Sequence, residues 1–210
     1  MNRYKLTYNR IFSKRQLTSK YLHTLFLSKK YDENLGWGFS NISLCGTLVS
    51  GSYLHKTKRY YQVWDAENNR LDKISYFIVK EIVFFLNIEK SCVIVLGGTT
   101  DLNGLKAAFR HLLWGEFTYA DFDSNVYAFV SDLYQSQMLM EIEEVSFSDV
   151  VIHNHFLGKY IAKPTTLINN IDSVKLIHGN LDKAKVRISM FENDFELSVS
   201  SNNTFTINGT

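Results

Sequence analysis

The fold class follows from one stretch, ISLCGTLVSGSYLHKTKRYYQVW (residues 42–64). Its two parts, Ile42–Val49 and Tyr53–Trp64, have the pattern of β-strands, and Ser50-Gly51-Ser52 between them has turn chemistry. The stretch therefore predicts two antiparallel strands. Polar residues Asp65–Arg70, which include Asn68-Asn69, predict a turn at the end of the second strand.

Alternating and helical patterns extend this assignment in both directions. Tyr4, Leu6 and Tyr8 alternate with polar residues, which predicts a first strand, and apolar residues at helical spacing predict an amphipathic helix within Lys14–Lys30. We expect Ile74–Ile88 to form a second hairpin with Cys92–Leu96, although a helix over part of Ile74–Leu86 fits the pattern too. Asp101–Trp114 has one apolar face and predicts a helix.

The second half of the chain is less regular. Asn125–Met138 fits either a helix or a strand. From Glu141 onward the pattern predicts short strands at Ile142–Phe147, Val150–Phe156, Val174–His178, Val186–Phe191, Phe195–Val199 and Thr204–Ile207. Glu192-Asn193-Asp194 supplies a turn between the fourth and fifth of these.

These elements predict an α+β fold with mostly antiparallel strands in two groups that flank a central helical region. A doubly wound parallel sheet is the less favoured alternative, because helices and strands do not alternate regularly. We expect a basic N-terminal α+β domain over residues 1–120 and an acidic, strand-rich domain over residues 121–210, although one single domain is also compatible with the length.

Composition excludes several classes of protein. Of the 210 residues, 45% are hydrophobic and only one is proline, which excludes disordered and collagen-like chains. Two cysteines, Cys45 and Cys92, are too few for a disulfide scaffold. The longest apolar run is shorter than the ~18 residues of a membrane span, and no signal-peptide pattern is present, so we expect a soluble cytoplasmic protein with no membrane partner.

Charge is distributed unevenly along the chain. Residues 1–90 carry 15 Lys and Arg against 7 Asp and Glu, whereas residues 91–210 carry 8 against 14, so the two parts have net charges of +8 and −6. Residues 1–30 contain no acid at all. Such separation attracts anionic partners or pairs one copy of the chain with another.

Cations and aromatic residues are interleaved in the segment His55–Trp64. On a strand, one face would carry Lys56, Lys58, Tyr60 and Trp64, and the other would carry His55, Arg59 and Tyr61. Cations that contact phosphates beside aromatic rings that stack on bases are the two components of a single-strand nucleic-acid surface. An edge strand that avoids unwanted pairing also uses Lys and Arg. The predicted nucleic-acid-binding residues are Arg3, Lys5, Arg10, Lys14, Arg15, Lys20, Lys56, Lys58, Arg59 and Tyr60.

Catalytic motifs are incomplete. Asp121 and Asp123, the acids Glu141, Glu143 and Glu144, and the pair His153 and His155 each suggest a cation site but supply too few ligands in a recognised spacing. The turn Gly97-Gly98-Thr99-Thr100-Asp101 outlines an anion site, yet Asp101 would repel a phosphate. Neither cysteine has a neighbouring histidine. We therefore expect no catalytic residue, no metal and no cofactor.

The favoured hypothesis is a non-catalytic nucleic-acid-binding or accessory subunit of a microbial or viral nucleic-acid-handling system. The alternatives are a protein-interaction or oligomeric scaffold subunit and a metal-dependent nuclease. The scarcity of proline and the abundance of Asn, Ile, Lys, Phe and Tyr are typical of proteins from AT-rich microbial or viral genomes.

Overall fold

The computed structural model describes residues 3–120, 125–153, 156–164, 179–190 and 193–209. The chain divides into two compact units. The arm unit contains residues 11–95 and 101–118, and the C-terminal unit contains residues 1–10, 96–100 and 119–210. Strand β1 (Arg3–Ser13) contributes its first residues to the C-terminal unit and its last to the arm unit.

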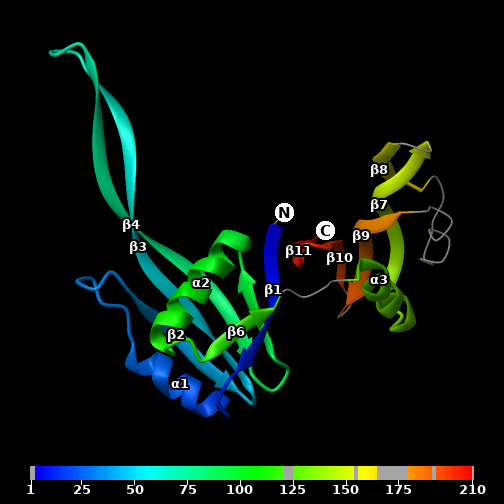
Figure 1. Cartoon of the computed structure of the whole chain (residues 1–210), viewed down its shortest axis with the longest axis horizontal. Coiled ribbons are helices and arrows are strands. Elements are labelled where there is room, and N and C mark those ends of the chain that lie inside the picture. Colours follow the sequence, from blue (N-terminus) through cyan, green and yellow to red (C-terminus); the bar gives the residue numbers. More distant parts are fainter. Residues whose placement is uncertain (1–2, 121–124, 154–155, 165–178, 191–192, 210) are drawn as a thin grey trace. The chain divides into compact units, whose positions relative to one another are not determined.

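Most described residues of the arm unit lie in strands. Its further elements are α1 (Ser19–Ser28), β2 (Trp37–Cys45), β3 (Leu48–Asp65), β4 (Arg70–Asn87), β5 (Cys92–Leu96), α2 (Thr99–Leu112), which starts in the other unit, and β6 (Phe117–Ala120), which ends there. Strands β2, β3, β4 and β5 lie side by side in that order, and the β2–β3 and β3–β4 pairs are antiparallel. Figure 1 shows the strands β3 and β4 continuing together far beyond the rest of this unit.

The core of the arm unit is aromatic. Phe26 of α1, Phe39 of β2, Phe84 of β4 and Phe109 of α2 are each at most 1% exposed. The Phe26 ring lies 4.8 Å from that of Phe39 and 5.3 Å from that of Phe109, in stacked geometry. One aromatic cluster therefore joins two helices to the sheet.

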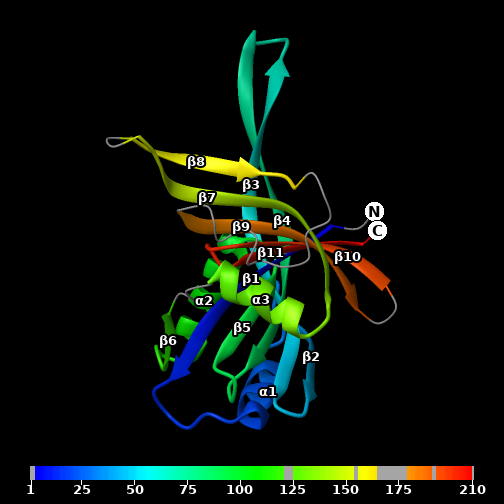
Figure 2. The same ribbon diagram turned by 90° about the vertical axis from the view of Figure 1, so that its right-hand side faces the viewer.

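The C-terminal unit also consists mainly of antiparallel strands. Its elements after β1 are α3 (Val126–Gln135), β7 (Leu139–His153), β8 (Phe156–Ala162), β9 (Asn180–Met190), β10 (Asn193–Ser200) and β11 (Thr204–Gly209). The strand order is β1-β11-β10-β9-β7-β8, and Figure 2 shows β8, β7 and β9 side by side with α3. Val126 and Val130 of α3 pack with apolar residues of β7, β9 and β10 in the core.

The fold is mainly β rather than a balanced α+β fold. Antiparallel strands were expected and are confirmed, but the described residues form eleven strands and only three helices. The ambiguous segment 125–138 contains helix α3, and the helix expected within 14–30 is limited to α1. Segments 142–147 and 150–156, expected as separate strands, belong largely to the single irregular strand β7. The expected strand at 174–178 lies outside the described residues.

The first hairpin turn was placed wrongly at Ser50-Gly51-Ser52, which lies inside β3. The strands connect through the two residues after Cys45, which pairs with Leu48, and the positive φ of Gly46 (+59°) suits a tight hairpin turn. Gly51 instead accommodates β2, because a Cβ there would lie 2.2 Å from Ile42 Cδ1. None of the described helices has the length and apolar character needed to cross a membrane.

Helix α3 begins at a side-chain cap. The Asn125 Oδ1 atom accepts a hydrogen bond from the Ala128 backbone N–H at 3.0 Å. We expect Asn125→Ala to lower the free energy of unfolding by about 1 kcal/mol, because the N–H loses its partner. Asn125→Asp is the matched control and should keep the stability, since its carboxylate also caps the helix. Urea denaturation followed by circular dichroism measures both; equal losses in the two variants would contradict the role of the cap.

Candidate nucleic-acid interface

The distal part of the β3–β4 hairpin, residues 56–79, is here called the arm. It consists of two paired strands joined by the turn after Asp65, where Asp65 pairs with Arg70. The Asp65 carboxylate accepts hydrogen bonds from the backbone N–H groups of Glu67 and Asn68 at 3.0 and 3.2 Å, which holds the turn. No arm residue is buried, so both faces of this two-stranded ribbon are open to solvent within the arm unit (Figure 1).

The register assigns every arm side chain to one of two faces, because directly paired residues point to the same side and successive residues alternate. The lysine face carries Lys56, Lys58, Tyr60, Gln62, Trp64, Leu71, Lys73, Ser75, Phe77 and Val79, and the tyrosine face carries Thr57, Arg59, Tyr61, Val63, Asp65, Arg70, Asp72, Ile74, Tyr76 and Ile78. The core residue Tyr53 lies on the same side of β3 as the tyrosine face.

Cations and aromatic rings contact each other on the lysine face. The Lys73 Nζ atom lies 4.3 Å from the centre of the Tyr60 ring, and Lys58 Nζ lies 5.4 Å from the same ring. Lys56 Nζ lies 5.1 Å from the centre of the Phe77 ring. These are cation–π distances, which position the ammonium groups beside the rings.

The rings of the lysine face remain available to a ligand. Tyr60 is 53%, Trp64 56% and Phe77 59% exposed. None of the face's residues is acidic, and the Lys56 ammonium lies 3.7 Å from the exposed Glu33 carboxylate. The face therefore combines three cations and three exposed rings with no carboxylate of its own.

The tyrosine face differs in charge. Arg70 forms an ion pair with Asp72 at 2.8 Å, and Asp65 adds a second carboxylate. The Tyr61 and Tyr76 rings meet edge to face, with centres 5.6 Å apart. Arg59 lies on this face, as its alternation with Lys58 and Tyr60 predicts, and so does not contribute to the lysine face.

The basic N-terminal residues are divided between the two units. Arg3, Lys5 and Arg10 belong to the C-terminal unit, and Lys14, Arg15 and Lys20 belong to the arm unit. Arg15 is engaged with Glu116, whose carboxylate lies 3.0 Å from the guanidinium.

The acids of β7 form ion pairs with cations of β9. Arg187 contacts Glu141 at 3.2 Å and Glu143 at 2.8 Å, and Lys185 contacts Glu143 at 2.9 Å. Glu144 lies 3.6 Å from Lys163 and 4.0 Å from Lys183. This acidic cluster thus has its counter-charges inside its own unit, and its carboxylates are engaged by cations.

The same network includes β10. Lys185 donates to the Glu196 carboxylate, and this hydrogen bond is the main cause that lowers the pKa of Glu196 and raises the pKa of Lys185. Asn208 also donates to Glu196. Glu196 is therefore held ionised by neighbours on two adjacent strands.

The remaining motifs concern metal, anion and thiol chemistry. Asp121, Asp123 and His155 lie outside the described residues, and His153 ends β7. Among the residues that the structure describes, no three His, Cys, Asp or Glu side chains gather as metal ligands. Asp101 at the start of α2 contacts the Lys80 ammonium. Burial raises the pKa of the Cys92 thiol, which disfavours the reactive thiolate.

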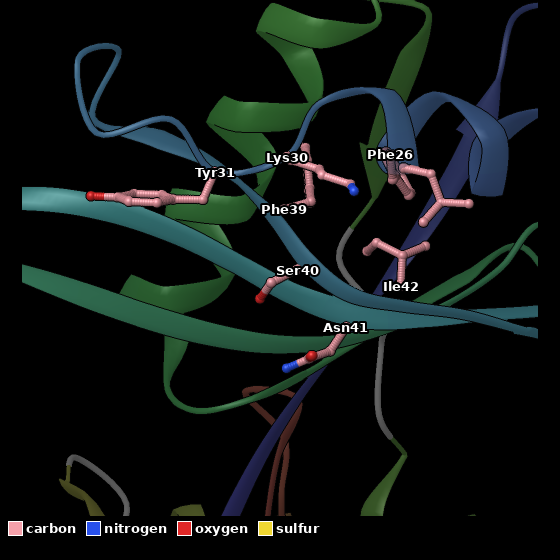
Figure 3. A pocket seen from close by; sticks show the side chains of 8 residues that line it. Phe26, Lys30, Tyr31, Phe39, Ser40, Asn41 and Ile42 are labelled. Carbon is pink, nitrogen blue, oxygen red and sulfur yellow. The ribbon is translucent and has the colours of Figure 1, made fainter.

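A largely apolar pocket of about 290 Å³ lies in the arm unit. Figure 3 shows Phe26 of α1 and Ile42 of β2 among the residues that line it. The pocket follows from an irregularity in β2, where the β2–β3 register shifts between Ser40 and Ser43 and Asn41 has a φ of +54°. The pocket lies beside the aromatic core and offers few charged groups, so it does not extend the lysine face.

Sequence reasoning missed half of the lysine face. Lys73 and Phe77 come from β4, which the pattern assigned to a hairpin with Cys92–Leu96 alone. The signal was present: the predicted turn at Asp65–Arg70 implies that the strand before it pairs with the strand after it.

Comparison with protein-family models and with curated proteins finds no match to this chain.

Proposed function

We propose that the protein binds single-stranded nucleic acid, without catalysis of its own, through the lysine face of the arm. One observation supports this most: the register gathers Lys56, Lys58 and Lys73 with three exposed aromatic rings on one face that contains no acid.

The chemistry of this face suits a flexible single strand. Ammonium groups neutralise phosphates, and exposed rings stack on bases at about 1–3 kcal/mol per base without demanding a particular sequence. Side chains on one face of a strand recur about every 6.7 Å, so cations and rings are distributed along the ribbon at this spacing. The proposal therefore predicts strong salt dependence and weak sequence preference.

Charge removal on the two faces tests the proposal. The double variant Lys58→Gln/Lys73→Gln should reduce the slope of log affinity against log salt by about 1.4, because each neutralised phosphate of a single strand contributes about 0.7. Fluorescence anisotropy of a labelled 20-nucleotide DNA or RNA between 50 and 300 mM salt measures the slope.

The matched control is Arg59→Gln/Arg70→Gln, which removes the same charge from the tyrosine face of the same arm. It should leave the slope nearly unchanged, because both arginines lie on the face opposite the lysines. The arm should stay folded, since the Arg70–Asp72 pair that the variant breaks is exposed and contributes little to stability. Equal changes in the two double variants would show that the arm acts only through its total charge, and the lysine face would then lose its role.

A second candidate function rests on the tyrosine face. Tyr61, Ile74 and Tyr76 are 48%, 43% and 45% exposed and form, with Val63 and Ile78, a continuous apolar and aromatic surface, which is a mark of protein contact sites. Association that persists at high salt, is lost in Ile74→Lys and occurs without oligonucleotide binding would favour a protein-interaction subunit.

A further inference from the structure

A basic pocket lies on the sheet of the C-terminal unit, on the side opposite the core that α3 covers. Three cations line it: Arg3 and Lys5 of β1 and Lys183 of β9. Four hydroxyl groups lie between them, from Ser198, Ser200, Thr204 and Thr206. The Ser200 hydroxyl donates a hydrogen bond to the Asn202 side chain, which also lines the pocket. Its volume is about 220 Å³. No carboxylate lines it.

The strand register explains this grouping. Lys5 pairs with Thr206, which pairs with Ser198, and in the next row Thr204 pairs with Ser200, which pairs with Lys183. Paired residues of neighbouring strands point to the same side, so the hydroxyls of β10 and β11 face the same way as the cations of β1 and β9. Neighbouring strands lie about 4.8 Å apart, which places the cations at the two sides of a hydroxyl-lined floor.

Nearby acids neutralise only part of the pocket's charge. Lys183 forms an ion pair with Glu144 at 4.0 Å, whereas Glu196 is engaged by Lys185 and Asn208. Within the described part of the chain, neither Arg3 nor Lys5 forms an ion pair. The pocket therefore keeps positive charge beside a face whose carboxylates are already paired.

We propose that this pocket binds a phosphate monoester group. Guanidinium and ammonium groups only donate hydrogen bonds, hydroxyls can donate, and a phosphate supplies three acceptor oxygens with a charge of about −1.5 to −2. Because a water occupies about 30 Å³, the pocket has room for a phosphate and part of the molecule that carries it. Its residues lie in the C-terminal unit, so the inference does not depend on the proposed function of the arm.

Equilibrium dialysis with labelled inorganic phosphate at constant ionic strength tests the pocket. We expect saturable binding that weakens at least tenfold in Arg3→Gln/Lys5→Gln. The matched control Lys14→Gln/Lys20→Gln removes the same charge from exposed positions of the arm unit and should change the affinity less than twofold. Thr206→Val, which keeps shape and charge, should weaken binding at least threefold through the lost hydroxyl.

Two probes distinguish a phosphate at the end of a polynucleotide from the phosphate of a small ester. If a polynucleotide end supplies it, a 5′-phosphorylated oligonucleotide should bind more tightly than its 5′-hydroxyl form, and Arg3→Gln/Lys5→Gln should remove the difference. If a small ester supplies it, a nucleoside monophosphate should displace labelled phosphate while the two oligonucleotides bind equally. Either result supports the pocket. Phosphate binding that does not saturate, or that weakens equally in the pocket and control variants, would overturn the proposal.

Discussion

Replacing Phe26 with alanine should lower the free energy of unfolding of the arm unit by about 3–5 kcal/mol. The Phe26 ring is fully buried and lies 4.8, 5.3 and 5.7 Å from the rings of Phe39, Phe109 and Phe84. Truncation removes the ring contacts between α1 and three other elements and leaves a cavity that three rigid rings cannot easily fill. The loss should therefore lie in the range typical of buried Phe truncation.

The three tryptophans provide a selective readout of this change. Trp37, Trp64 and Trp114 all belong to the arm unit, so tryptophan fluorescence during urea denaturation follows that unit alone. Leu27→Ala is the control, because Leu27 is the next residue of the same helix but is 41% exposed, and it should cost below about 1 kcal/mol. A loss below about 1 kcal/mol for Phe26→Ala would show that the aromatic cluster does not hold this unit together.

Local sequence patterns predicted where strands and helices lie better than they predicted which strands pair. Alternation in Tyr4–Tyr8 and Tyr53–Trp64 identified strands, and the apolar spacing in Asp101–Trp114 identified α2 nearly at its observed bounds. Pairing is a tertiary property: Ile74–Ile88 has the same strand pattern whether its neighbour is β3 or β5, and in the structure it lies between both. The balance of helix and strand was wrong because the strands extend well beyond their apolar cores.

The candidate site was predictable only in part for the same reason. Alternation alone placed Lys56, Lys58 and Tyr60 on one face and Arg59 on the other. Lys73 entered that face only through the β3–β4 register. The basic pocket could not be predicted in this way, because Lys5 and Lys183 are far apart in sequence and lie on β1 and β9, with β11 and β10 between them.

A shortened arm should lose nucleic-acid affinity by at least 100-fold while the protein stays folded. The register allows a precise deletion of residues 57–64 and 71–78, which removes eight residues from each strand. Lys56 then precedes Asp65, and Arg70 precedes Val79, so the Asp65–Arg70 pair takes the place of the pair between Thr57 and Ile78. Because each strand loses an even number of residues, the alternation of faces and the native turn are kept.

The expected size follows from the groups removed. Loss of Tyr60, Trp64 and Phe77 removes stacking at about 1–3 kcal/mol per base, and loss of Lys58 and Lys73 removes two phosphate contacts; each 1.4 kcal/mol is tenfold in affinity. None of the deleted residues is buried, so the thermal midpoint should move by less than about 4 °C. Anisotropy titration at 100 mM salt, with circular dichroism melting as the folding control, measures both. Unchanged affinity in a folded, shortened protein would remove the arm from the interface, whereas equal loss for a labelled oligonucleotide and for inorganic phosphate would show that the deletion damaged the C-terminal unit instead.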